Sequence, residues 1–122
     1  MIKDWNGYGQ QITDALKELG KAAPNAMRGY REFNRSAFDT VHLDAKTREL
    51  IALAVAVSLR CDGCINAHAG MAASAGATRE EVGEALGVSL AVNAGAAVVY
   101  SAHVMDALDA QSGTIAPAKV VD

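Results

Sequence analysis

The sequence predicts an all-α protein of six helices, and three observations support this class. Apolar residues make up 51% of the 122 residues and aromatic residues only 5%, so the apolar content is mainly alanine, valine and leucine. Alanine has the highest helix propensity of all residues. Apolar side chains recur at helical spacing, for example at Ile12, Leu16 and Leu19. Val55 to Leu59 could be a strand on periodicity alone, but no other segment supplies a partner for a sheet.

Helix-start and turn residues divide the chain into its expected elements. Asp44 suits the N-cap of one helix, and Thr78 with Glu81 three residues later forms a capping box at the start of another. Pro24 suits the first turn of a helix. Helices are expected at Gly9–Gly20, Pro24–Phe38, Ala45 to about Leu59, from Cys61 to near Gly76, from Thr78 to a break at Asn93–Gly95, and from there to about Ala110, between an N-terminal arm (1–8) and a mobile C-terminal tail (111–122).

The third expected helix contains the run Leu50–Val57, which has apolar residues on every side. A helix that is apolar all round is buried all round, so this segment is expected at the centre of a single domain spanning residues 1–122. A core of small side chains buries little area per residue. We therefore expect further burial between subunits, in an obligate homo-oligomer.

Charge and hydropathy disfavour two classes of partner. The net charge is −3, from 11 basic and 14 acidic residues, which argues against a nucleic-acid surface. The N-terminal residues lack the apolar core of a signal peptide. Residues 85–105 carry no formal charge, but they are rich in alanine and contain Asn93 and His103, so we interpret them as two buried helices rather than a membrane span. The protein is expected in the cytoplasm.

The segment around the two cysteines holds the candidate chemistry. Cys61 and Cys64 lie three residues apart and His68 follows four residues later, so in a helix all three side chains share one face. Positions i and i+3 allow a disulfide, and a helix N-terminus stabilises a thiolate. Gly63 leaves space beside the sulfurs, and Glu49, twelve residues before Cys61, could hold the imidazole tautomer or act as a base. These parts suit a thiol redox site.

Several assignments stay open on this reasoning. Cys61 is closer to the helix start, which favours it as the attacking thiol, whereas Cys64 is closer to His68. The two thiols and His68 could also bind zinc with Glu49 or His42, although structural zinc sites usually have a second cysteine pair. Buried structural thiols are a further alternative. A lyase for a lactone or keto acid would instead use His68 and Glu49 as acid and base.

The same residues carry a family resemblance. The segments Leu43–Ala56, Arg60–Cys64 and Ala67–His68, extended by Gly76–Thr78, Glu80–Glu81 and Val99–His103, resemble the alkylhydroperoxidase D-like branch of the carboxymuconolactone decarboxylase family. The resemblance covers about residues 24–108. The Glu…CxxC…His pattern is typical of the redox-active branch, and the decarboxylases proper look different at the thiols.

The resemblance implies an all-helical homo-oligomer, commonly a trimer or hexamer, that reduces hydroperoxides. We expect no metal or cofactor. It implies that Cys64 becomes a sulfenic acid, that Cys61 is proton donor and resolving thiol, and that Glu49 and His68 form a proton relay. A lipoyl- or thioredoxin-like dithiol would re-reduce the disulfide. The chain departs from the best-known members at Gly63, where they carry histidine or another side chain. A relay group is therefore missing at this position, which affects the expected rate of peroxide reduction more than the redox chemistry itself.

Other polar residues are assigned no catalytic role. His103 and Tyr100 lie one turn apart and are expected to form a core or interface pair rather than a substrate contact. The arginines of the second expected helix are expected to form a solvated face rather than an anion-binding surface (Arg28, Arg31 and Arg35).

Overall fold

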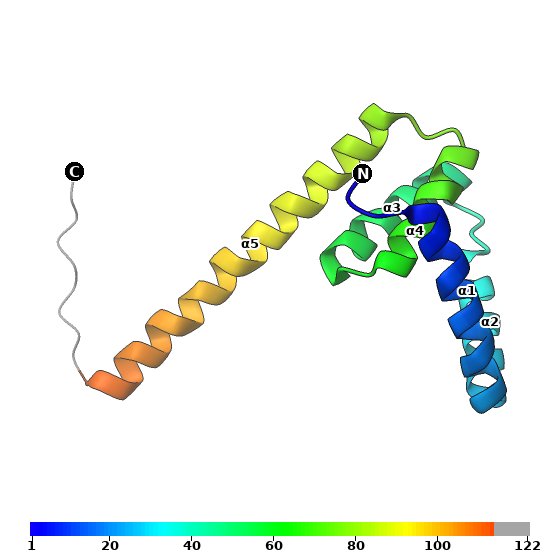
Figure 1. Ribbon diagram of the computed structural model, residues 1–122. Coiled ribbons are helices and arrows are strands. Elements are labelled where there is room, and N and C mark those ends of the chain that lie inside the picture. The colour runs from blue at the N-terminus through cyan, green and yellow to red at the C-terminus, as the bar shows by residue number, and fades with distance from the viewer. Residues whose placement is uncertain (114–122) are drawn as a thin grey trace. The chain divides into compact units, whose positions relative to one another are not determined.

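The computed structural model describes residues 1–113, and these residues form helices and no strands. The helices are α1 (Trp5–Ala22), α2 (Pro24–Phe38), α3 (Ala45–Leu59), α4 (Asp62–Ser74) and α5 (Arg79–Ser112) (Figure 1). By its internal contacts the chain divides into two units, Met1–Ser89 and a second unit that begins at Leu90. The all-α class is therefore confirmed over the described residues.

The prediction of six helices is wrong, because α5 continues through the expected break at Asn93–Gly95. A glycine inside a helix costs only about 1 kcal/mol relative to alanine. The residues on either side of this glycine are mainly alanine and valine, and the run beyond them is also apolar. The strong helix propensity of the alanines outweighs the local cost, so the fifth and sixth expected helices are one element.

The two ends of the chain also differ from the prediction. α1 begins at Trp5, where the side chain of Asp4 caps the helix by accepting the N–H of Gly7 at 3.2 Å, so the N-terminal arm is shorter than residues 1–8. Residues 111 and 112 lie in α5 rather than in the expected tail. Gly113 follows the helix, and residues 114–122 of that tail lie outside the described residues.

The helix starts predicted from capping residues are confirmed. Asp44 accepts the N–H of Thr47 at 2.8 Å. Thr78 and Glu81 form the reciprocal capping box, since each side chain accepts the backbone N–H of the other residue, at 3.1 and 3.2 Å. These short-range bonds satisfy amides that a helix leaves unpaired at its start.

Helix α3 packs against α4, and α1 packs against both α2 and α4. The buried apolar residues of the described chain are Leu53 and Ala56 on α3 and Ala72 on α4. Ile51 and Val55, which share another face of α3, are about half exposed, at 48% and 51%. The expectation that α3 is buried all round therefore fails for the single chain, because α4 covers only one side of it.

Helix α5 is long and apolar enough, by length and composition, to cross a membrane. It is the one such helix among the described residues. Core helices of soluble proteins pass the same criterion, so this property by itself assigns no membrane to the protein.

Candidate functional site

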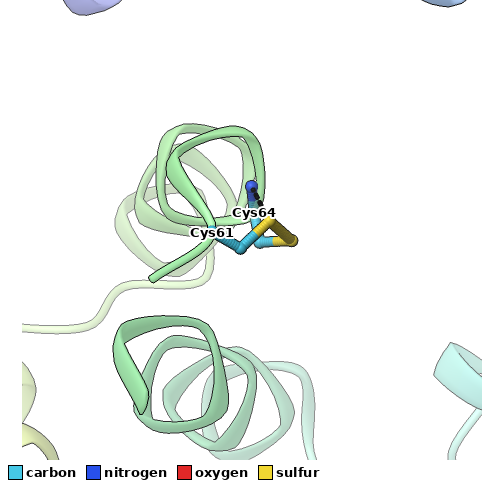
Figure 2. Close-up of a disulfide and its surroundings, with 2 residues drawn as sticks. All are labelled: Cys61 and Cys64. Carbon is cyan, nitrogen blue, oxygen red and sulfur yellow. Dashed lines mark hydrogen bonds between the residues drawn. A yellow bond between two sulfur atoms is a disulfide. The ribbon is translucent and has the colours of Figure 1, made fainter. Parts of the chain in front are cut away.

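The two cysteines lie at the start of α4, as the sequence predicts (Figure 2). They form a disulfide with their α-carbons 5.3 Å apart. Cys61 is the N-cap residue of the helix, and its sulfur accepts the backbone N–H of Cys64 at 3.2 Å. A helix N-terminus carries unpaired N–H groups and partial positive charge, and both favour a thiolate in the reduced pair.

A buried carboxylate lies beside the imidazole on the same helix as the disulfide. The side chain of Glu49, from the second turn of α3, is only 3% exposed, and its Oε2 lies 2.7 Å from Nδ1 of His68 on α4. An ionised carboxylate can only accept hydrogen bonds, so Nδ1 is the donor. This assigns the tautomer and leaves Nε2 as the ring nitrogen available for proton exchange.

Two residues that the sequence analysis did not assign to the site also contact this pair. Arg48 lies 3.4 Å from the second carboxylate oxygen of Glu49, and its Nη1 donates to the backbone carbonyl of Phe38 at 2.8 Å. The ring of Phe38 stacks on the His68 imidazole, with centroids 5.1 Å apart and planes 9° apart. Arg48 adjoins Glu49 in the sequence, which could have pointed to this contact, whereas nothing in the sequence pointed to Phe38.

Cys64 and His68 both line a groove between α2, α3 and α4, with a volume of about 400 Å³. The other walls are mainly apolar and include Ile51, Val55 and Leu59. A groove of this size and lining suits a small organic molecule.

The residues between the cysteines lie against the N-terminal part of the chain. Lys3 forms a salt bridge with Asp62 at 2.6 Å, and this hydrogen bond raises the pKa of Lys3. A Cβ atom placed on Gly63 would lie 3.9 Å from Ile12 and 4.0 Å from the hydroxyl of Tyr8. The space expected at Gly63 is therefore faced by α1, whereas Cys64 also lines the groove between α2, α3 and α4.

The remaining candidate residues lie apart from this cluster. His42 is exposed in the connector between α2 and α3. His103 stacks on Tyr100 in the second unit, with centroids 4.5 Å apart, and Tyr100 is 71% exposed, so the pair is not part of a core in the single chain. Arg28 and Arg35 are exposed and bond to neighbours one turn away on α2.

Over residues 1–113, no group of three or more histidine, cysteine, aspartate or glutamate side chains could hold a metal ion. The two sulfurs are bonded to each other, so the zinc arrangement considered from the sequence is not assembled in this state.

Comparisons with known proteins support one family. Residues 24–107 match the sequence profile of the carboxymuconolactone decarboxylase family. An uncharacterized protein of Haemophilus influenzae is 45% identical over 111 residues, covering 91% of this chain and 98% of that protein. An uncharacterized protein of Cupriavidus necator is 34% identical over 82% of this chain and 88% of its own. The crystal structure of a carboxymuconolactone decarboxylase family protein from Legionella pneumophila matches with a TM-score of 0.69 and 34% identity, over 86% of this chain and 94% of that one.

Proposed function

Because the chain belongs to the carboxymuconolactone decarboxylase family, we propose that it works in the redox branch of that family, as a thiol–disulfide oxidoreductase that reduces hydroperoxides. The resemblance of its Glu…CxxC…His pattern to the alkylhydroperoxidase D-like branch supports this choice. The proposal includes a cytoplasmic location and a lipoyl- or thioredoxin-like dithiol as electron donor.

The observation that carries the proposal is the hydrogen bond between buried Glu49 and His68, on the helix that begins with the disulfide. A structural disulfide needs no acid–base group beside it. An imidazole with a fixed tautomer, lining the same groove as Cys64, is suited to accept the thiol proton and return it.

The proposed reaction uses both thiols and balances as follows. The Cys64 thiolate attacks one oxygen of the hydroperoxide, the O–O bond breaks, and the leaving alkoxide takes a proton through His68 and Glu49 to become an alcohol. Cys64 is then a sulfenic acid. The Cys61 thiol then gives up its proton through the same relay, and its thiolate attacks the Cys64 sulfur. The S–O bond breaks, the proton goes to the departing hydroxide, water leaves, and a disulfide forms. The external dithiol returns two electrons and two protons and restores the thiols.

The lining of the groove indicates which class of hydroperoxide would fit it. Its walls are mainly aliphatic and aromatic side chains, which favour a substrate with an apolar body over hydrogen peroxide itself. Gly63 itself carries no titratable group, so in this proposal the proton moves through His68 and Glu49 without a further relay residue at that position.

The test is a single turnover with the fully reduced protein. One equivalent of cumene hydroperoxide is expected to produce the disulfide, a loss of about 2 Da from the intact mass, because two thiol hydrogens are removed. In a Cys61→Ser variant the sulfenic acid cannot be resolved, so dimedone should label Cys64. The Cys64→Ser variant should react with neither reagent. Reduced wild-type protein that keeps both thiols after excess hydroperoxide would refute the proposal.

A lyase remains as a second candidate, because Glu49 and His68 form an acid–base pair that does not itself require the sulfurs. Alkylation of both thiols distinguishes the two functions. Oxidoreductase activity would be abolished by alkylation, whereas turnover of a lactone or keto acid would persist.

A further inference from the structure

We propose that Arg48 and Phe38 are positioning residues that hold the Glu49–His68 pair in the geometry needed to serve Cys64. The proposal rests on the relay role given to that pair above. Neither residue belongs to the Glu…CxxC…His pattern, and they come from different elements, Phe38 from the end of α2 and Arg48 from the first turn of α3.

The first argument concerns the charge of Glu49. Its side chain is 3% exposed, and a buried carboxylate without a charged partner is strongly unfavourable. His68 can supply that partner only while it is protonated, but a relay histidine must lose its proton in every cycle. Arg48 lies 3.4 Å from the other carboxylate oxygen and stays protonated throughout. It therefore compensates the carboxylate at the stage when the imidazole is neutral.

The second argument concerns the orientation of His68. Beyond its covalent attachment at Cβ, the imidazole ring is restrained by one hydrogen bond, from Nδ1 to Glu49, which leaves the tilt of the ring plane weakly defined. Phe38 covers a face of the imidazole, nearly parallel to it, with centroids 5.1 Å apart. This stack fixes the plane of the ring, and with it the direction of Nε2.

The two residues are also joined to each other. Arg48 donates to the backbone carbonyl of Phe38, one of the last carbonyls of α2, which the helix itself leaves unpaired. Its guanidinium carbon lies 5.9 Å from the centroid of the Phe38 ring. One arginine thus sets the charge beside Glu49 and fixes the helix end that carries the stacking ring.

The experiment measures two rates for Cys64 in the reduced protein: alkylation by iodoacetamide, located by peptide mapping, and oxidation by cumene hydroperoxide. The variants are Arg48→Met and Phe38→Leu, each alone and combined with His68→Asn. Each single variant is expected to lower both rates of Cys64 about tenfold at neutral pH. This is a part of the ~10²–10⁴-fold rate increase that a positioned proton-transfer group supplies. In the His68→Asn background neither should slow it further, because the relay is already lost.

Rescue and control variants separate positioning from general damage. Phe38→Tyr keeps the stack and should keep the rate, and Arg48→Lys keeps the charge and should recover part of it. Arg35→Met and Phe33→Leu, which change exposed residues of α2, should leave both rates unchanged. Thermal melting of each variant identifies any that fail to fold.

Failure of the positioning proposal can be distinguished from failure of the proposed function. If wild-type protein does not reduce the hydroperoxide, the proposed function fails, and alkylation of Cys64 still tests the positioning. Two results would overturn the positioning proposal. In one, Arg48→Met and Phe38→Leu slow alkylation of Cys64 equally in the wild-type and His68→Asn backgrounds. In the other, they leave the alkylation rate unchanged in the wild-type background.

Discussion

At the scale of single residues, Glu49 is the charged residue that is buried in the described chain. The whole residue is 2% exposed, and each of its carboxylate oxygens faces a nitrogen of a neighbouring side chain. Burying a charge is unfavourable unless it is paired and hydrogen-bonded, and helix packing alone would be better served by an apolar residue at this position. The arrangement is therefore more readily explained by chemistry than by stability.

Replacing Glu49 with glutamine tests this interpretation directly. Glutamine keeps the shape of the side chain and can still accept the hydrogen bond from His68, but it cannot stabilise a positive imidazole. We expect the oxidation of Cys64 by cumene hydroperoxide to slow by about 10²-fold or more, while the protein still folds. Stopped-flow measurement of single-turnover disulfide formation provides the rate.

Glu84→Gln is the matched control for this substitution, because Glu84 is an exposed carboxylate on α5. It should oxidise at the wild-type rate. An unchanged rate in Glu49→Gln would show that the carboxylate charge has no part in the proton transfer.

At the scale of elements, the start of α5 depends on a small network of hydrogen bonds. The Glu81 carboxylate accepts a hydrogen bond from Lys46 of α3 at 3.0 Å and one from the backbone N–H of Thr78 at 3.2 Å. Both lower the pKa of Glu81 from its ordinary value of 4.5, Lys46 by the larger amount. The network therefore connects the cap of α5 to Lys46 in the first turn of α3, three residues before Glu49.

The lowered pKa predicts how this network responds to acid. A carboxyl group with a lower pKa in the folded state adds stability above its unfolded pKa and loses it as the pH falls through the folded value. We expect the melting temperature of wild-type protein to exceed that of Glu81→Gln at neutral pH, and the difference to shrink below about pH 4. Differential scanning calorimetry over a pH series measures this difference.

Glu80→Gln is the control, since Glu80 lies in the same helical turn and is exposed. The melting temperature of Glu80→Gln should differ less from that of wild type at neutral pH. Thr78→Ala removes the other half of the capping box and should cost about 1 kcal/mol at all pH values. A gap in melting temperature between wild type and Glu81→Gln that does not shrink as the pH falls below the ordinary pKa of the group would contradict the assignment.

The elements also show which parts of the structure were predictable. Helix starts were found where a side chain bonds to an amide three residues away, as at Asp44 and Thr78, because this interaction is local in sequence. The continuity of α5 through Gly95 was missed, because a glycine is a weak signal whose effect depends on the whole surrounding segment.

The same distinction holds in the candidate site. The cysteine pair at a helix start could be predicted from spacing alone, since both residues lie within one turn. The stack of Phe38 on His68 joins residues thirty positions apart, and the bond from Arg48 to the Phe38 carbonyl depends on how α2 ends. These contacts follow from tertiary packing, which no pattern in one sequence specifies.

At the scale of the whole molecule, the small amount of burial is the main feature. The buried apolar residues of the described chain are Leu53, Ala56 and Ala72, whereas large apolar side chains on α3 and α5 remain exposed. On α5 alone, Val98 and Val99 are exposed at 72% and 70%. Soluble monomers seldom expose so many large apolar side chains, so further burial against another surface is expected.

We predict that the surface covering these side chains is a second copy of the chain. Light scattering coupled to size-exclusion chromatography should give a mass that is a multiple of 12.7 kDa, with a trimer or hexamer expected from the family resemblance.

Val98→Glu places a charge among the exposed apolar residues of α5, so it should shift the population toward smaller species. Gln111→Glu, an equal change of charge near the end of the same helix, should leave the mass unchanged. A stable, cooperatively folding 12.7 kDa monomer would refute the prediction, and recovery of the protein with lipid vesicles would show that a membrane covers α5 instead.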